Sequence, residues 1–197
     1  MIPSNAVMAA RQHLAPVLPT ARCVVDATAG NGNDTLFLCQ QTPADCRIFA
    51  FDIQLAAIRS ATDLIARHGF LEKVSWFHAD HAQVKNHVDA PIDAAVFNLG
   101  YLPGQDHSVT TGPASLAPAL QGVLDLLVPG GRITLVAYPG HGPGLAEIDF
   151  LETTLSRYSQ QQFVVTRLNF INQCNNPAIL YTIGKARRDL NENSSSN

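Results

Sequence analysis

Apolar blocks alternate with stretches of helical periodicity along this chain, and the two patterns predict strands and helices in turn. Short apolar runs predict strands near Cys23–Ala27, Arg47–Phe51, Val74–His78, Ile92–Asn98 and Arg132–Ala137. Helical spacing predicts helices near Asn5–Leu14, Asp34–Gln41, Leu55–His68, Gln83–His87, Ser115–Leu127 and Leu145–Tyr158. Two more strands, near Gln162–Asn169 and Ala178–Gly184, follow the last helix with no helix between them.

This order predicts an α/β fold with a Rossmann-like, seven-stranded, mostly parallel sheet. Strands that alternate with helices form parallel sheets covered on both faces, and the closing pair of strands predicts an antiparallel hairpin at one edge. The 197 residues, 46% of them apolar, suffice for one compact domain. We expect that domain to span residues 1–188, and we expect a disordered tail at 189–197, where the sequence is polar and low in complexity.

Composition narrows the function classes. The net charge of −3 supplies no overall basic field of the kind that drives tight nucleic-acid binding, although Lys185, Arg187 and Arg188 form either a local basic patch or a merely solvated cluster. The four cysteines have no CxxC spacing, which favours reduced thiols. No secretion signal or membrane-length apolar run occurs, so we expect a cytoplasmic protein without a membrane partner.

The most informative motif is DATAGNGND, Asp26–Asp34, between the first predicted strand and the helix after it. Gly30 and Gly32 allow a sharp turn and a close approach of a ligand at a helix N-terminus. The third glycine of the dehydrogenase fingerprint is missing, which disfavours a nicotinamide cofactor. An acid and an asparagine-rich loop would repel a pyrophosphate and suit S-adenosylmethionine, a cationic sulfonium nucleoside.

The next two strand ends carry further candidates. Asp52, in FDIQ, stands where an acid accepts hydrogen bonds from both ribose hydroxyls, and Gln54 can reach the adenine side. Asp52 could equally cap the following helix. After the third strand, Asp80 and His81 could border the adenine ring. His78 and His81 also form a His-x-x-His pair, but no further ligands complete a metal site, so we expect none.

The fourth predicted strand ends in NLGYLPG, Asn98–Gly104. Asn98 with Tyr101 has the outline of the Asn-Pro-Pro-Tyr loop of methyltransferases that act on amino nitrogens, although Leu99 and Gly100 replace the prolines. In that loop, oxygens accept hydrogen bonds from the amino group and aim its lone pair. The alternative is a turn with a buried tyrosine. His141, in the turn YPGHGPG, is a catalytic candidate by location alone.

Taken together, DATAGNGND, FDIQ, FNLGYLPG, TTG, GGRITLVAYPGH and FINQCNNP resemble one bacterial family over about Cys23–Gly184. These are small class I methyltransferases, first described as rRNA methylases and now associated with methylating 5-aminomethyl-2-thiouridine at the tRNA wobble position. The resemblance implies that Asn98 and Tyr101 border the reacting nitrogen and that Gly30 and Gly32 shape the cofactor loop. It implies S-adenosylmethionine contacts from Asn31, Asn33, Asp34, Asp52, Gln54, Asp80 and His81.

The predicted reaction is in-line methyl transfer to a primary amine, with His107, His141 or Asp106 as candidate proton acceptors. The tRNA anticodon region is the expected partner, and a homodimer would enlarge the surface available to it. FINQCNNP, Phe170–Pro177, is expected to serve substrate binding or dimer contacts, or to be only a hairpin connection. Alternatives are methylation of rRNA or of a small amine, and a nucleotide- or RNA-binding module without turnover.

Overall fold

A computed structural model describes residues 2–100, 112–140 and 142–187. The strands are β1 (Cys23–Asp26), β2 (Arg47–Asp52), β3 (Val74–His78), β4 (Ile92–Asn98), β5 (Leu127–Ala137), β6 (Phe163–Leu168) and β7 (Ile179–Lys185). The α-helices are α1 (Ala6–Leu14), α2 (Asn33–Gln41), α3 (Leu55–Arg67), α4 (Val84–His87), α5 (Pro113–Leu126) and α6 (Gly142–Leu155). Short 3-10 helices are η1 (Leu18–Thr20), η2 (Leu71–Lys73) and η3 (His81–Gln83).

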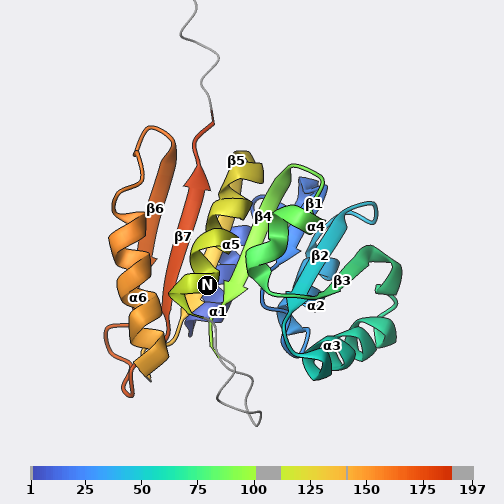
Figure 1. The fold of residues 1–197 in the computed structure, drawn as a ribbon, viewed down its shortest axis with the longest axis horizontal. Helices are drawn as coiled ribbons and strands as arrows, with labels where there is room; N and C mark the ends of the chain where they lie inside the picture. Colours follow the sequence, from blue (N-terminus) through green and yellow to red (C-terminus); the bar gives the residue numbers. More distant parts are fainter. Residues whose placement is uncertain (1, 101–111, 141, 188–197) are drawn as a thin grey trace, which may run out of the picture.

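In the described part of the chain, the strands form one seven-stranded sheet in the order β3-β2-β1-β4-β5-β7-β6 (Figure 1). The pairs from β3 to β5 are parallel, and β7 pairs antiparallel with both β5 and β6. This confirms the predicted α/β class I methyltransferase topology with its antiparallel hairpin at one edge.

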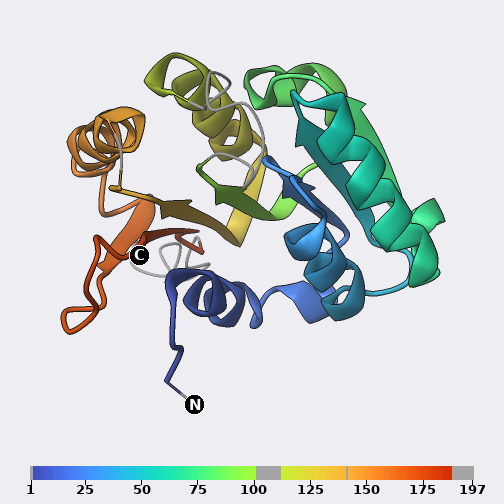
Figure 2. The same cartoon turned by 90° about the horizontal axis from the view of Figure 1, so that it is seen from below.

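Successive side chains of the buried strands pack into two hydrophobic cores, one on each face of the sheet. Val25 of β1 packs into a core with residues of α4, α5 and α6, whereas its neighbour Val24 packs into one with residues of α1, α2 and α3. Helices therefore cover both faces; Figure 2 shows α1 and α2 below the sheet and α5 and α6 above it. Among the helices of these described segments, none is both long and apolar enough to cross a membrane.

The largest differences from the predicted boundaries are in β5 and α6, and most other elements differ by one or two residues at an end. β5 begins at Leu127 instead of Arg132, because Leu127 already pairs with Ile92 before a register shift. Gly130, between the two paired stretches, has a positive φ of 85°. Helix α6 ends at Leu155 instead of Tyr158, because the amides of Arg157 and Tyr158 bond to carbonyls three residues back. Neither difference moves a strand end that carries a candidate residue.

Candidate functional site

The candidate residues gather at one edge of the sheet. Strands β1 to β5 are mutually parallel, so their carboxyl ends finish on the same side. Asp26 ends β1, Asp52 ends β2 and Asn98 ends β4, while Asp80 and His81 follow β3. The topology thus brings together residues that lie as much as 72 positions apart in the sequence (98 − 26).

The loop after β1 is shaped by its glycines. Gly30 and Gly32 have positive φ angles of 51° and 83°. A Cβ added to Gly32 would lie 2.9 Å from Ala61 of α3, so the missing side chain also lets the start of α2 approach α3. Asn31 and Asn33 are exposed on this loop. The loop is therefore exposed to solvent, and its backbone amides lie at the start of α2.

Asp26 supports this loop from beneath. Its carboxylate has no exposed surface and accepts hydrogen bonds from the Thr35 hydroxyl at 2.6 Å and the Thr28 amide at 3.2 Å. Burial raises the pKa of Asp26 from 3.8 to about 7, and Asp34 adds to the rise, while the two hydrogen bonds oppose it. Asp26 therefore joins β1 to the first turn of α2.

Asp52 ties the β1 loop to the β2 loop. One carboxylate oxygen accepts from the Gly30 amide at 2.9 Å and the other from the Gln54 amide at 2.8 Å. The N-cap of α3 is Gln54, so Asp52 lies two residues before the capping position. Because each carboxylate oxygen has more than one lone-pair site, both can still accept from a pair of hydroxyls.

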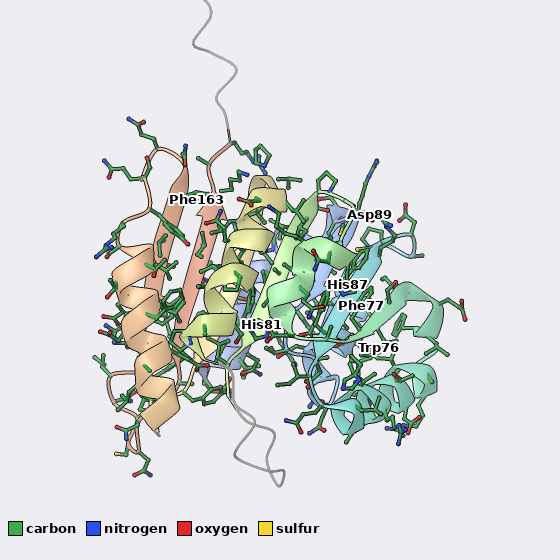
Figure 3. All side chains as sticks on the ribbon, in the orientation of Figure 1. Trp76, Phe77, His81, His87, Asp89 and Phe163 are labelled. Carbon is green, nitrogen blue, oxygen red and sulfur yellow. The ribbon has the colours of Figure 1, made fainter. Side chains whose placement is uncertain are left out.

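Asp80 and His81 differ in their surroundings. Asp80 caps η3, accepting from the Ala82 amide at 2.8 Å. His81, which is labelled in Figure 3, is 5% exposed. Its ring lies edge-on to that of Phe97, and its Nε2 has no hydrogen-bond partner among the described residues. Burial lowers the pKa of His81, against the opposing charges of Asp80 and Asp52. A neutral imidazole nitrogen without a partner is suited to a neutral heterocycle.

His78 does not join His81. Its Nε2 is paired with the Ile53 carbonyl at 3.0 Å on the exposed side of β3. Across the described residues, no three His, Cys, Asp or Glu side chains are grouped to hold a metal ion.

Asn98 is held by three neighbours. Its backbone amide donates to the Thr28 hydroxyl at 2.7 Å, and its side-chain Nδ2 donates to Asp34 at 3.2 Å. Its Oδ1 accepts from the Tyr138 hydroxyl at 2.9 Å. Arg11 of α1 binds the other Asp34 oxygen through Nη2 at 2.8 Å and Nε at 3.1 Å. The side chain of Asn98 is thus fixed in orientation as well as in place.

The motif analysis missed Arg11, Thr28 and Tyr138. Tyr138 lies in the same YPGHGPG turn as His141. It follows Asn98 by 40 residues, and no pattern in the sequence indicates that the two side chains are in contact. Two predicted catalytic residues, Tyr101 and His141, lie outside the described residues, as do Asp106, His107, Thr110 and Thr111.

The electrostatics of this edge favour a cation. Asp34, Asp52 and Asp80 stand at or beside the strand ends, and Arg11 pairs with Asp34. Excess negative charge attracts a sulfonium and repels a pyrophosphate. The Asp52 carboxylate fits the ribose of a nucleoside. The residues present therefore fit S-adenosylmethionine.

Comparison with known proteins agrees. Residues 48–184 match the family described as "Putative rRNA methylase". The chain is 33% identical to "tRNA (mnm(5)s(2)U34)-methyltransferase, chloroplastic" of Arabidopsis thaliana over 84% of its own length, and spans only 64% of that protein. A solved structure from Clostridium thermocellum, described as a "putative rRNA-methylase", is 37% identical, with a TM-score of 0.90 over 94% of this chain and 100% of that one.

A solved structure from Streptococcus mutans, described as a "putative methyltransferase" in complex with SAH, is 32% identical, with a TM-score of 0.85 over 94% of this chain and 99% of that one. The fold and the cofactor edge define a class I methyltransferase that uses S-adenosylmethionine. Within that class, the chain belongs to the putative rRNA methylase family, whose model covers more than half of it. The predictions of family, enzyme class and cofactor are confirmed.

Proposed function

We propose that this enzyme methylates the aminomethyl nitrogen of 5-aminomethyl-2-thiouridine at position 34 of tRNA, giving the 5-methylaminomethyl form. The observation that carries the proposal is Asn98, whose amide oxygen stands at the tip of β4 beside the cofactor loop. A fixed amide oxygen there suits an acceptor nitrogen that bears hydrogens. The similarity to a plant enzyme named for that wobble nucleoside supports the choice of tRNA.

Within the cofactor site, we assign Asp52 to the ribose hydroxyls and His81, with Gln54 and Asp80, to the adenine side. Gly30 and Gly32 shape the loop, Asn31, Asn33 and Asp34 border it, and Asp26 holds it from beneath. When bound, S-adenosylmethionine supplies an electrophilic methyl group attached to a sulfonium sulfur. The protein's task is then to align the acceptor nitrogen with that methyl carbon and to exclude water.

The acceptor nitrogen must have a free lone pair. An alkylammonium therefore loses one proton first, to solvent or a neighbouring base. The neutral amine then forms its N–C bond as the S–C bond breaks, and the positive charge passes from sulfur to the methylated nitrogen. Asn98 Oδ1 accepts one N–H of the amine and so aims the lone pair. Tyr101 and His141 remain proposed members of this acceptor site.

The test is mass spectrometry of tRNA nucleosides after incubation with the protein and methyl-labelled S-adenosylmethionine. The substrate is tRNA from cells that lack this methylation. A labelled methyl on 5-aminomethyl-2-thiouridine is the expected result. A label on another nucleoside, on rRNA only, or on no RNA would contradict the proposal; matched tRNA bearing unmodified uridine at position 34 is the negative control.

A further inference from the structure

Asn98 lies within a chain of hydrogen-bonded polar side chains that begins on α1 and ends at Tyr138. Arg11 of α1 binds Asp34 of α2, Asp34 accepts from Asn98 Nδ2, and Tyr138 after β5 donates to Asn98 Oδ1. The sequence separations are 23, 64 and 40 residues, so only the folded sheet assembles it. Both ends of the Asn98 amide are therefore specified by different elements.

The chemistry of the partners dictates which way the amide points. An ionised carboxylate can only accept, so the NH₂ end of Asn98 must face Asp34. The opposite orientation would place the amide oxygen against the carboxylate and lose the hydrogen bond to Asp34. Burial and the charge of Asp34 raise the pKa of Tyr138 above 10, so its hydroxyl stays protonated and is free to donate to Oδ1.

Gly100 makes room for Tyr138. A Cβ at Gly100 would lie 3.3 Å from Cδ2 of Tyr138, closer than ordinary van der Waals contact. The Asn-Pro-Pro-Tyr outline has a proline at this position, and its ring carbons would press on the tyrosine. The replacement of that proline by glycine therefore accompanies the approach of Tyr138 to Asn98.

We propose that Tyr138 and the Arg11–Asp34 pair are positioning residues that fix the Asn98 amide with its oxygen toward the acceptor. The Asn98 oxygen keeps one lone pair that Tyr138 does not use. The site then accepts a methyl acceptor that donates an N–H and rejects one that presents only a lone pair there. This selectivity rests on the proposed function, whereas the fixed orientation of the amide does not.

Two variants test the positioning role by activity. Tyr138→Phe removes one hydroxyl and Asp34→Asn removes one charge at nearly constant shape. For Tyr138→Phe we expect kcat for methyl transfer to fall by roughly 5- to 10-fold, as the loss of one hydrogen bond predicts, while KM for tRNA changes less than twofold. Tyr181→Phe is the matched control, because it loses a 2.9 Å hydrogen bond to Glu152 away from the cofactor edge.

A double-variant cycle separates positioning from a direct role. If Tyr138 acts through Asn98, then adding Tyr138→Phe to the Asn98→Ala variant lowers kcat no further. Independent, multiplying losses in the double variant would overturn the proposal, as would a Tyr138→Phe rate equal to that of Tyr181→Phe.

A spectroscopic measurement tests the positioning role without any substrate. In ¹⁵N-labelled protein, the Asn98 side-chain NH₂ pair is assigned by its disappearance in Asn98→Ala. It should shift in Tyr138→Phe and in Asp34→Asn and stay in place in Tyr181→Phe. An unmoved pair in both test variants overturns the positioning role even if the tRNA is methylated; a moved pair in a protein that methylates no tRNA upholds it and refutes the proposed function alone.

Discussion

The hydroxyl of Thr35 donates a 2.6 Å hydrogen bond to the fully buried carboxylate of Asp26. This contact connects the end of β1 to the first turn of α2. It also holds the Asp26 carboxyl group where water cannot solvate it. The pKa of Asp26 is consequently raised from 3.8 to about 7. The loop that carries the cofactor contacts therefore rests on a group that titrates near neutral pH.

The first prediction concerns stability against pH. The folded chain holds the Asp26 proton more tightly than the unfolded chain, so this contribution is complete below pH 3.8 and is lost as pH rises toward 7. Asp26→Asn stays uncharged, so the wild type should lose stability relative to it by up to about 4 kcal/mol over that window. Urea unfolding of both proteins at several pH values measures this, and parallel curves would refute it.

The second prediction concerns Gly32. Gly32→Ala combines a positive φ with a contact of 2.9 Å to Ala61, so it should lower the free energy of unfolding by about 2 to 4 kcal/mol. Gly69→Ala is the matched control, because Gly69 has a φ of 75° and no neighbour within 4 Å of the added Cβ. The control should cost only about 1 kcal/mol. Equal losses by thermal or urea unfolding would show that the close approach of α2 to α3 is unimportant.

The third prediction concerns cofactor affinity. Asp52→Ala should weaken S-adenosylmethionine binding by about 10-fold or more, because the ribose loses a charged acceptor and the Gly30 amide loses its partner. Isothermal titration calorimetry measures the change. Asp63→Ala, at an exposed position of α3, should leave the affinity unaltered. Wild-type affinity in Asp52→Ala would remove Asp52 from the cofactor site.

The fourth prediction separates binding from chemistry. Asn98→Ala should lower kcat for methyl transfer by about 100-fold or more, while cofactor affinity changes by less than about threefold, because the amide oxygen acts on the acceptor. Single-turnover assays and calorimetry give the two quantities. Asn86→Ala, on the exposed surface of α4, serves as the control. A variant of Asn98 that turns over at the wild-type rate would end its proposed role.

Local sequence patterns were enough to predict the candidate residues that lie at strand ends. Asp26, Asp52 and Asn98 each end an apolar run, and parallel strands bring such ends to one edge. Local patterns could not predict Arg11 or Tyr138, because their contacts depend on how α1 packs and on the register that pairs Asn98 with Val136. The early start of β5 could not be predicted for a similar reason. Pro129 and Gly130 resemble a turn in the sequence, and only the pairing of Leu127 with Ile92 places the strand start before them.

The packing of α1 links the last strand of the sheet to the candidate site. Ala6, Ala9 and Ala10 of α1 pack on Val136 of β5 and Leu180 of β7, and the same helix carries Arg11 to Asp34. β7 is the last strand of the sheet to be synthesised. A nascent chain that ends before Leu180 therefore lacks part of the surface on which α1 packs, and we expect the contact between Arg11 and Asp34 to be weaker in it than in the full chain.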